Sequence, residues 1–280
     1  MSYNQLILYI FCLFFTNIYT RDKAIIVGAT SGMGRQVAKM LSKDYDIGLV
    51  GRRLNLLESL KAEIPTKSYI KQIDVTQAEA AIQKLSELIE EMGGLDLIVI
   101  SISAANDNLP NGNLANSNLI NDDLETKKKF EKNKKTIDVD LFGFWIMADT
   151  ALSFFEKQKS GHLVGISSTS GLRGSASCPV YSGAKAFISR YLEGVRNQMI
   201  QKNIPIHITD IIPGWVEIEA EDIHKIPGAY WVATTQKAAQ QICDAIKAKK
   251  KKAYITKRWQ LIAWLYGITP DFIYNAIGGF

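Results

Sequence analysis

Tyr181 and Lys185 are four positions apart, and Ser168 precedes Tyr181 by 13 residues. On a helix, residues i and i+4 share a face, so the phenol and the ammonium group are expected to lie side by side. A phenol with its usual pKa of about 10 is a poor base at neutral pH, but a neighbouring ammonium group lowers that pKa. The pair therefore predicts a general acid/base. A chain this rich in lysine contains about one such pair by chance, so the pair alone is a weak signal.

The place of Ser168 in the chain strengthens this prediction. It follows the apolar run His162–Ser167, which we expect to be a strand. Open α/β sheets bind ligands at the carboxyl ends of their strands. The segment Thr169–Pro179 is small and rich in glycine, so it can fold Ser168 toward Tyr181. We therefore expect Ser168, Tyr181 and Lys185 to form one constellation.

A second chemical signal lies near the start of the chain, where an apolar run ends in Gly28 and further glycines follow at Gly32 and Gly34. Between a strand and a helix, this GxxxGxG pattern is typical of a turn that binds the phosphates of a dinucleotide. Gly28 permits the tight turn, Gly32 lets the backbone approach a pyrophosphate, and Gly34 allows close helix–strand packing. The helix N-terminus favours the negative charge. The alternative is an ordinary glycine-rich turn.

Two arginines follow the second apolar run, Ile47–Val50, and distinguish between the nicotinamide dinucleotides. An NAD-binding chain usually carries an acidic residue here, which binds the ribose 2′-hydroxyl. This chain has Gly51, Arg52 and Arg53 instead. Guanidinium groups form bidentate, charge-assisted hydrogen bonds with phosphate, so the pattern favours NADP(H) over NAD(H). The alternative is that both arginines are surface residues at a helix start.

The elements that must position these residues alternate between strand-like and helix-like stretches. Continuous short apolar runs suit a parallel sheet covered on both faces, and the alternation indicates βαβ units. We predict an α/β fold with a doubly wound, mostly parallel sheet of about seven strands and helices on both faces. The expected strands are Ala24–Gly28, Ile47–Val50, Ser68–Ile73, Leu95–Ile102, His162–Ser167, Ile204–Ile212 and Ala253–Thr256. The expected helices are Gly32–Leu41, Leu54–Ile64, Gln77–Met92, Leu124–Gln158, Tyr181–Met199 and Thr235–Ala248, with an Asn-rich loop at Ala104–Asp123.

With these motifs in this order, the sequence resembles the short-chain dehydrogenase/reductase (SDR) family from about Ala24 to Val216. The resemblance implies a Rossmann-type fold, a nicotinamide cofactor, and hydride transfer to or from a carbonyl or alcohol group. It also implies that Ser168, Tyr181 and Lys185 act on the substrate oxygen, with Tyr181 as the proton donor or acceptor. The tail after about Tyr230 looks like that of a bacterial subgroup of uncharacterised members.

The resemblance further implies which residues contact the cofactor. Asp74 corresponds to the family's adenine-contacting acid, and Pro213-Gly214 corresponds to the segment that lies against the nicotinamide. The expected cofactor-binding residues are Gly28, Thr30, Ser31, Gly32, Met33, Gly34, Arg52, Arg53, Asp74, Val75, Ser101, Tyr181, Lys185, Pro213, Gly214 and Val216.

Three places depart from the family pattern. Ile100–Ser103 stands where the family has an Asn-Asn-Ala-Gly turn, so the ribose contacts of that turn are open. The family's fourth catalytic residue, an asparagine, falls at Asp140. This aspartate could order a relay water beside Lys185, or form an ion pair that alters the effect of Lys185 on Tyr181. A threonine that contacts the nicotinamide carboxamide is replaced around Glu217.

Composition excludes several other classes of function. The 280 residues, 47% hydrophobic and 22% charged, fit one large α/β domain. The net charge of +5 lies mostly in two lysine-rich runs, 127–135 and 247–252, which we interpret as solvated helix faces. No nucleic-acid partner is expected, because aromatic residues do not interleave with the first run. Neither the three cysteines nor the three histidines have metal-ligand spacing, so no metal site or disulfide framework is expected.

Both ends of the chain are apolar. Residues 1–22 contain the run Leu6–Ile18, which is too short for a comfortable transmembrane helix and lacks the flanks of a signal peptide. It is a tether, a weak signal segment, or residues upstream of the true start, and the last is favoured because the first strand begins directly afterwards. Residues 23–256 are expected to form the catalytic domain. Residues 257–280 are an apolar tail that covers the substrate cleft, forms a subunit interface or contacts a membrane.

Three functions stay open. The first is an NADP(H)-dependent oxidoreductase for a small carbonyl or alcohol, in the reducing cytoplasm, forming a homodimer or homotetramer as the family commonly does. The second is a sensor or scaffold that binds NADP(H) without turnover, motivated by Asp140 and the altered turn Ser101–Ser103. The third keeps the chemistry but takes lipid carbonyls at a membrane surface, through the apolar tail and the lysines upstream of it.

Overall fold

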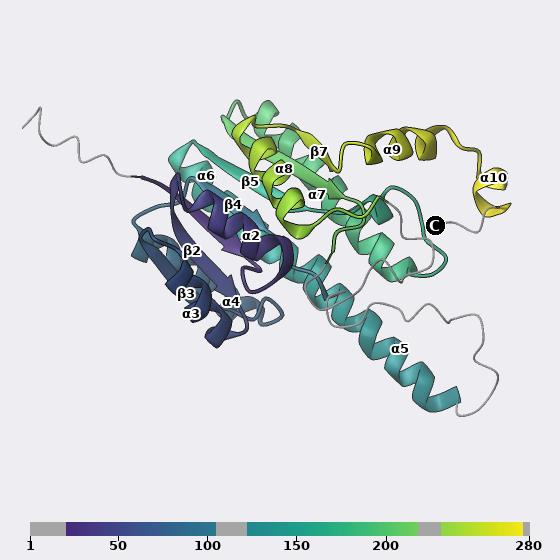
Figure 1. Cartoon of the computed structure of the whole chain (residues 1–280), viewed down its shortest axis with the longest axis horizontal. Helices are drawn as coiled ribbons and strands as arrows, with labels where there is room; N and C mark the ends of the chain where they lie inside the picture. Colours follow the sequence, from purple (N-terminus) through teal and green to yellow (C-terminus); the bar gives the residue numbers. More distant parts are fainter. Residues whose placement is uncertain (1–20, 105–121, 218–230, 277–280) are drawn as a thin grey trace, which may run out of the picture.

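The computed structural model describes residues 21–104, 122–217 and 231–276. A seven-stranded sheet in the order β3-β2-β1-β4-β5-β6-β7 forms its centre (Figure 1). Every neighbouring pair of strands is parallel, so the expected α/β sheet is confirmed and is parallel throughout. The strands are β1 (Asp22–Val27), β2 (Tyr45–Gly51), β3 (Ser68–Gln72), β4 (Leu97–Ile100), β5 (Gly161–Ile166), β6 (Ile206–Pro213) and β7 (Lys252–Ile255).

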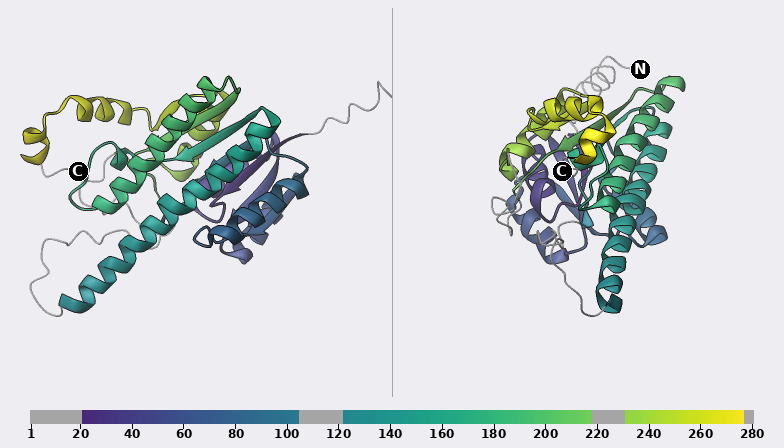
Figure 2. Two further views of the ribbon diagram at one scale, coloured as in Figure 1. Left: turned by 180° about the vertical axis from the view of Figure 1, so that it is seen from behind. Right: turned by 90° about the vertical axis from the view of Figure 1, so that its right-hand side faces the viewer.

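Helices cover both faces of this sheet, as doubly wound folds require. The apolar residues of α4 (Ala78–Met92), α6 (Phe144–Gln158) and α7 (Pro179–Gln201) form one core with the sheet. Those of α2 (Gly32–Leu41), α3 (Leu54–Glu63) and α8 (Thr235–Lys247) form the other core. Figure 2 shows α6 and α7 side by side on their face of the sheet, with α5 (Asp122–Thr136) extending beyond it.

The expected strand and helix boundaries lie within two residues of the observed ones, and that of α2 is the same at both ends. The strand expected at Leu95–Ile102 is shorter, Leu97–Ile100, because its ladder with β1 ends where Ile100 faces Val27. The Ser101 amide still donates to the Val27 carbonyl at 2.8 Å, and then the chain leaves the sheet. The first strand begins at Asp22, two residues before the expected Ala24, since Asp22 already pairs with Tyr45 of β2.

The helix expected at Leu124–Gln158 is not one regular α-helix. A π-helical segment, Ile137–Gly143, separates α5 from α6. Gly143 allows this segment to pass the rest of the domain closely, since a Cβ there would lie 2.5 Å from a methyl group of Val75. The wider turn points Asp140 into the interior, where it is fully buried. Such π-segments are frequent at functional sites.

The chain reverses its winding between β1 and β4. From β1 it proceeds outward to β2 and β3, and then returns to β4 on the other side of β1. In open α/β sheets ligands bind beyond the carboxyl ends of the strands at this reversal. The glycine-rich turn after β1 and the turn after β4 meet there, which defines the end of the sheet that can hold a site.

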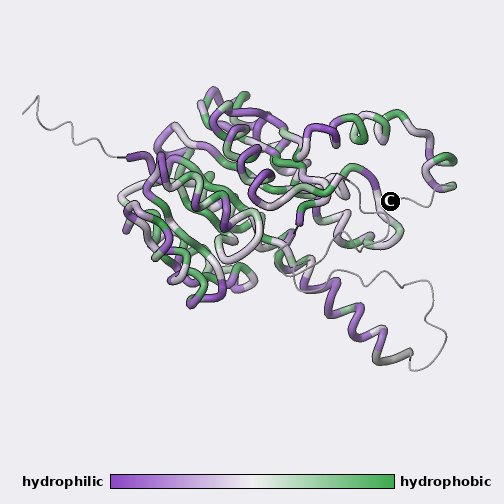
Figure 3. The backbone as a smooth tube through the Cα atoms, in the orientation of Figure 1, coloured by the Kyte–Doolittle hydropathy of each residue, from purple (hydrophilic) through white to green (hydrophobic). Residues whose placement is uncertain are grey.

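After β7 the chain continues into α9 (Trp259–Ile268) and α10 (Asp271–Ala276), which lie outside both helix layers (Figure 1). Along the tube of Figure 3, α9 is one of the strongly apolar stretches at the surface. No helix among the described residues is long and apolar enough to cross a membrane. Of the expected N-terminal extension, residues 1–20 lie outside the described residues, as do 105–121 of the Asn-rich loop.

A buried histidine in the sheet makes the stability of the fold depend on pH. The Nε2 atom of His162 on β5 shares a hydrogen bond with the Thr209 hydroxyl, at 2.8 Å. Burial, His207 and Lys249 lower the pKa of His162 from 6.5 to about 4. The unfolded chain therefore takes up this proton at higher pH than the folded chain does. The stabilisation is complete above the unfolded pKa and is lost as the pH falls from there toward the folded pKa.

We expect His162 to account for about 3 kcal/mol of lost unfolding free energy between neutral pH and about pH 4. Urea unfolding of the wild type and of His162→Gln across this range measures the effect. The variant should show the smaller dependence on pH. His207→Gln is the comparison variant: His207 is exposed beside His162 on β6 and lowers the pKa of His162 less than burial does, so most of the pH dependence should remain. Equal pH dependence in the wild type and His162→Gln would contradict the prediction.

Candidate functional site

The three residues of the expected constellation lie together at the carboxyl end of the sheet. Ser168 follows β5 and begins a short 3-10 turn, Thr169–Gly171, whose Ser170 amide donates to the Ser168 hydroxyl at 3.2 Å. Tyr181 stands in the first turn of α7 and Lys185 one turn later. Ser168 is close enough to Tyr181 to lower the pKa of its hydroxyl. The Lys185 ammonium nitrogen lies 5.5 Å from the centre of the Tyr181 ring.

The helix start and the preceding loop account for this placement. Pro179 occupies the first turn of α7, where its missing N–H costs no helical hydrogen bond. The loop lies close on the helix at Gly171, where a Cβ would be 2.7 Å from the Ala186 amide nitrogen. Only a residue without a side chain fits there, so the glycine-rich segment brings Ser168 to Tyr181 as expected.

Asp140 forms the ion pair that was one of the two expectations for it. Its Oδ2 atom lies 3.2 Å from the Lys185 ammonium nitrogen, and their side chains are 0% and 3% exposed. The same carboxylate accepts a hydrogen bond from the Ser103 hydroxyl at 2.9 Å and one from the Ala104 amide at 2.6 Å. It therefore connects the altered turn after β4 to Lys185. Ser103 and Ala104 were not predicted as its partners.

These charges set the proton affinities of the site. Burial lowers the pKa of Lys185, but the Asp140 carboxylate and Tyr181 raise it, and the net pKa is raised. Burial raises the pKa of the Tyr181 hydroxyl; Lys185 and Ser168 lower it, while Asp140 and Cys178 raise it. The net pKa of Tyr181 is raised. The lysine has the expected effect on the tyrosine, but burial outweighs it, so Tyr181 is a protonated phenol at neutral pH.

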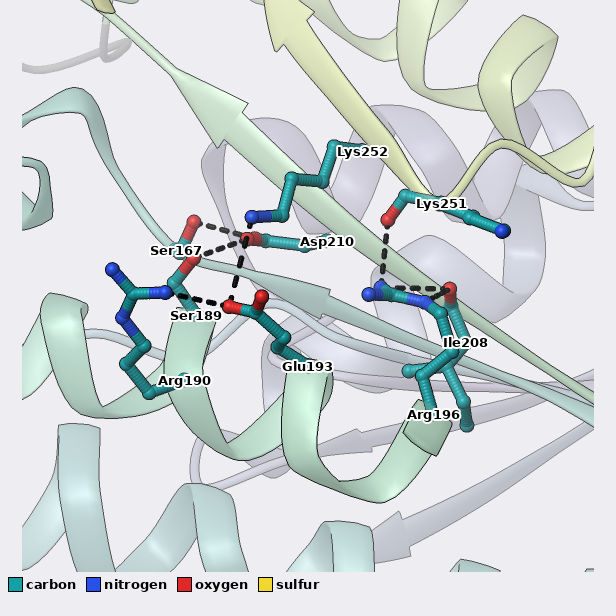
Figure 4. A network of polar contacts seen from close by, with 9 residues as sticks. All are labelled: Ser167, Ser189, Arg190, Glu193, Arg196, Ile208, Asp210, Lys251 and Lys252. Carbon is teal, nitrogen blue, oxygen red and sulfur yellow. Dashed lines mark hydrogen bonds and ion pairs between the residues drawn. The ribbon is translucent and has the colours of Figure 1, made fainter. Parts of the chain in front are cut away.

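A second buried carboxylate, which was not predicted, joins the residue that follows β5 to helix α7. Asp210 on β6 accepts hydrogen bonds from Ser167 at 2.6 Å and from Ser189 at 2.5 Å (Figure 4). Burial raises the pKa of this carboxyl. Ser167 precedes Ser168, and Ser189 lies one turn after Lys185 on α7. A single acid within an otherwise apolar strand was the signal in the sequence that could have identified Asp210.

The glycine-rich turn after β1 shows why two of its glycines are needed. Gly28 has φ +89°, and a Cβ on it would lie 2.3 Å from the Ser101 carbonyl oxygen. A Cβ on Gly34 would lie 2.3 Å from the Gly28 carbonyl oxygen. The turn after β1, the start of α2 and the turn after β4 are thus in direct backbone contact. Ser101, expected at the cofactor, packs on the glycine turn through this carbonyl.

Gly32 differs from these two glycines. A Cβ there would meet no atom within 4 Å, so the start of α2 opens onto free space. The side chain of Ser31, the residue that precedes the helix, makes no capping hydrogen bond. This arrangement fits an anion at the helix N-terminus. Met33, also expected there, packs at the edge of the neighbouring core.

The two arginines lie beside this opening. Arg53, exposed at the end of β2, donates to the Thr30 hydroxyl at 2.9 Å and to the Ser31 hydroxyl at 3.1 Å. Arg52 is exposed, and its carbonyl accepts a hydrogen bond from Gln72 at 2.8 Å. The structure therefore places Arg53 at the glycine-rich turn. This is the position required of a residue that binds a phosphate group next to that turn.

The other expected cofactor residues surround the same end of the sheet. Asp74 is exposed, and its carboxylate accepts hydrogen bonds from the Thr76 amide and hydroxyl at 3.0 and 2.8 Å. Val75 is buried and packs its side chain on Gly143. Val216 is buried and forms an isolated bridge with Ala233. Ile218, next to Glu217, lies outside the described residues.

Pro213 and Gly214 end β6 beside a residue of the tail that was not predicted at the site. A Cβ on Gly214 would lie 1.9 Å from the Trp259 ring, so the indole lies directly on the glycine. Trp259 is 4% exposed, whereas most of α9 is not buried. The Gly214 amide donates to the Ile255 carbonyl at 2.7 Å. The C-terminal tail is thus in contact with the segment expected to lie against the nicotinamide.

Comparison with known proteins agrees with this geometry. The family model described as short chain dehydrogenase matches residues 22–223. An uncharacterized oxidoreductase of Myxococcus xanthus is 30% identical over 215 residues, which is 75% of this chain and 78% of the relative. An uncharacterized oxidoreductase of Mycobacterium tuberculosis is 31% identical over 71% of this chain and 75% of its own length. Among solved structures, a variant of ElxO with NADPH bound has a TM-score of 0.67 at 20% identity, covering 84% of this chain and 97% of its own. That structural likeness concerns the fold.

Proposed function

The chain belongs to the short-chain dehydrogenase family of oxidoreductases, and from this premise we propose that it transfers hydride between NADP(H) and a carbonyl or alcohol substrate. One observation carries the proposal: Tyr181 lies beside the buried cation Lys185, and both Lys185 and Ser168 are close enough to lower the pKa of its hydroxyl. Proton transfer to an oxygen needs a donor whose protonation state and orientation are both set. This arrangement supplies both at the end of the sheet where such folds bind ligands.

The open space at Gly32 and the N-terminus of α2 fit the pyrophosphate of a dinucleotide. Arg53, with Thr30 and Ser31, and Arg52 next to it would hold a 2′-phosphate; the absence of an acidic residue at the end of β2 argues for NADP(H) over NAD(H). Asp74, Val75 and Ser101 would border the adenine and ribose, and Pro213, Gly214 and Val216 the nicotinamide. The ElxO variant with NADPH bound is consistent with this choice.

When bound, the dinucleotide supplies the hydride. The residues of the chain bind the substrate oxygen and donate a proton to it. The Ser168 hydroxyl donates a hydrogen bond to that oxygen, and Tyr181 donates its proton as negative charge develops there. The raised pKa of Tyr181 keeps this proton on the phenol at neutral pH, as proton donation to the substrate oxygen requires. Lys185, held by Asp140, keeps a positive charge beside Tyr181 and partly offsets the effect of burial.

We expect Arg52→Ala/Arg53→Ala to weaken NADPH binding on the order of ten- to a hundredfold and to leave NADH binding unchanged. Hydrogen bonds between charged groups contribute about 1.5–3 kcal/mol, and NADH lacks the phosphate they would contact. Fluorescence titration of both cofactors measures this. Lys61→Ala is the matched control, because Lys61 is an exposed cation on α3 away from the turn.

Equal affinity for both cofactors, untouched by the double substitution, would refute the arginine argument. A second function, binding of NADP(H) without turnover, is motivated by the Asp140–Lys185 ion pair, which the family pattern lacks. Tight NADPH binding with no reduction across a broad panel of carbonyl compounds would favour this sensor or scaffold. Turnover of any compound in the panel would exclude it.

We also propose that the chain acts in the cytoplasm, where a nicotinamide cofactor is supplied, and that it forms a homodimer or homotetramer. Exposed Phe142 and Trp145, next to α7 on the same side of the sheet, support an interface between copies. The mass of the purified chain by light scattering tests the oligomer, and a monomer at all concentrations would contradict it. The division into a catalytic domain, 23–256, and a tail, 257–280, stays part of the proposal.

A further inference from the structure

The tail helices α9 and α10 carry an apolar surface that faces away from the protein. In α9, Leu261, Trp264, Leu265 and Ile268 follow the i, i+3, i+4, i+7 spacing of one helix face, and they are 55%, 59%, 39% and 57% exposed. Phe272 and Ile273 of α10 extend this surface, and Phe272 is 74% exposed. A surface helix normally turns such a face to the core. We call these six residues the tail stripe.

The opposite side of the same two helices is anchored, so the tail stripe is presented in a defined orientation. Trp259 is buried on Gly214 at the start of α9. At the other end, the Arg173 guanidinium lies 4.0 Å from the centre of the Tyr274 ring and donates to the Thr269 carbonyl at 2.6 Å. The Tyr274 hydroxyl donates to the Gly174 carbonyl at 2.9 Å. Both helices are therefore fixed to the body of the protein through their other side, and the tail stripe is exposed in spite of these contacts.

The charge around the tail stripe is positive. Lys257 and Arg258 stand directly before α9, and the only acidic residue in the segment 257–276 is Asp271. The carboxylate of Asp271 is paired with Arg173. An apolar helix face that includes an exposed Trp and has basic residues at its start suits the boundary between water and an anionic lipid layer.

We propose that the tail stripe docks the protein on an anionic phospholipid surface. The two helices stand out from the body (Figures 1 and 2), so a flat layer can reach them without touching the helix layers of the sheet. A dimer formed through the same stripe would bring together two tails of positive charge, and the only acidic residue of the segment 257–276, Asp271, is already paired with Arg173. A lipid surface meets those cations with phosphate groups instead.

Docking would also orient the site. Trp259 touches Gly214, and Arg173 stands five residues after Ser168, so the anchored side of the tail borders both. This placement favours apolar carbonyl or alcohol substrates that partition into lipid. The choice of substrate rests on the proposed oxidoreductase function. The docking itself requires no turnover, so its test is separate from any assay of activity.

Flotation of the full chain with vesicles tests the docking. Vesicles of phosphatidylcholine, with and without phosphatidylglycerol, are compared for the wild type and for Trp264→Ser/Ile268→Ser/Phe272→Ser. We expect the wild type to float with the anionic vesicles and the triple variant to bind at least about tenfold more weakly. Lys257→Gln/Arg258→Gln should reduce flotation with anionic vesicles only. The control is Phe130→Ser/Ile200→Ser, which replaces exposed apolar residues on α5 and α7.

Residues 1–20 are present in every protein compared, so their apolar run contributes equally to all samples. Circular dichroism melting confirms that each variant is folded. Flotation of the triple variant to the same extent as the wild type would overturn the proposal. A wild type that does not float, but whose mass in solution falls to that of a monomer in the triple variant, would also overturn it and assign the stripe to a second copy of the chain.

Discussion

Tyr181→Phe should lower kcat for carbonyl reduction by about a thousandfold and leave NADPH binding unchanged. A positioned general acid contributes roughly 10²–10⁴ in rate, and phenylalanine removes the proton while keeping the ring. The ring still packs beside Lys185, whose ammonium nitrogen lies 5.5 Å from its centre, so the surroundings are retained. Steady-state kinetics with NADPH, together with fluorescence titration of NADPH, separate the chemical step from binding.

Tyr191→Phe is the matched control for this experiment. Tyr191 lies on the same helix, α7, and also has its hydroxyl in a hydrogen bond, with Asp149 at 3.2 Å. Tyr191 lines a pocket between α6 and α7, away from Ser168. Its hydroxyl therefore has no part in the proposed proton transfer. Equal loss of kcat in both variants would mean that the helix, and not the Tyr181 proton, limits the rate. Full activity of Tyr181→Phe would remove the proposed mechanism.

Asp140→Ala is expected to lower the free energy of unfolding by about 3–5 kcal/mol. Removing one partner of a buried ion pair leaves an uncompensated charge in the interior. Lys185 would be that charge, since its side chain is 3% exposed and Asp140 is its partner at 3.2 Å. The Ala104 amide and the Ser103 hydroxyl would lose their acceptor as well. Urea unfolding measures the change, and an effect below about 1 kcal/mol would contradict a buried pair.

Asp138→Ala is the control for this stability effect. Asp138 lies in the same π-helical segment, but its ion pair with Lys134 is at the surface. Surface pairs contribute roughly 0–1 kcal/mol, so we expect little change. A loss as large as that of Asp140→Ala would show that the helix segment, and not the buried pair, is sensitive.

Asp140→Asn separates the charge of this residue from its shape. The amide oxygen can still accept from the Ala104 amide, so the loss of stability should be smaller than for alanine. Asp140 raises the pKa of both Lys185 and Tyr181, so a neutral residue lowers both. In reduction Tyr181 must be protonated, and therefore the alkaline limb of the pH–rate profile should move to lower pH. An unmoved limb would mean that Asp140 acts on folding alone.

Most of the secondary structure could be predicted because its signals are local. Most strands contain a short apolar run, and most helices are periodic stretches bounded by glycine, proline or polar residues, so the predicted ends were within two residues of those observed. The π-helical segment was not predictable. The residue types of Ile137–Gly143 are those of an ordinary helix, and the π-helical turn changes only which of its residues face the interior.

The candidate site likewise has features that could be predicted from the sequence and features that could not. Ser168, Tyr181 and Lys185 could be predicted because the strand end and the helix start that carry them are close in the chain. The role of Gly28 could be predicted too, but the atom that requires it, the Ser101 carbonyl oxygen, could not. The net pKa of Tyr181 was beyond prediction, because burial, which raises it most, depends on everything packed around it.

The amino-acid sequence alone was enough to predict the parallel α/β sheet, the glycine-rich turn after β1, the arginines after β2 and the grouping of Ser168, Tyr181 and Lys185. These follow from residue types and spacings within single strand–turn–helix units. Only the tertiary structure decided that Asp140 pairs with Lys185, that Asp210 joins Ser167 to Ser189, and that Trp259 covers Gly214. Each of these contacts joins separate elements, and which atoms meet depends on the phase and packing of whole helices. Spacing along the chain carries no information about that.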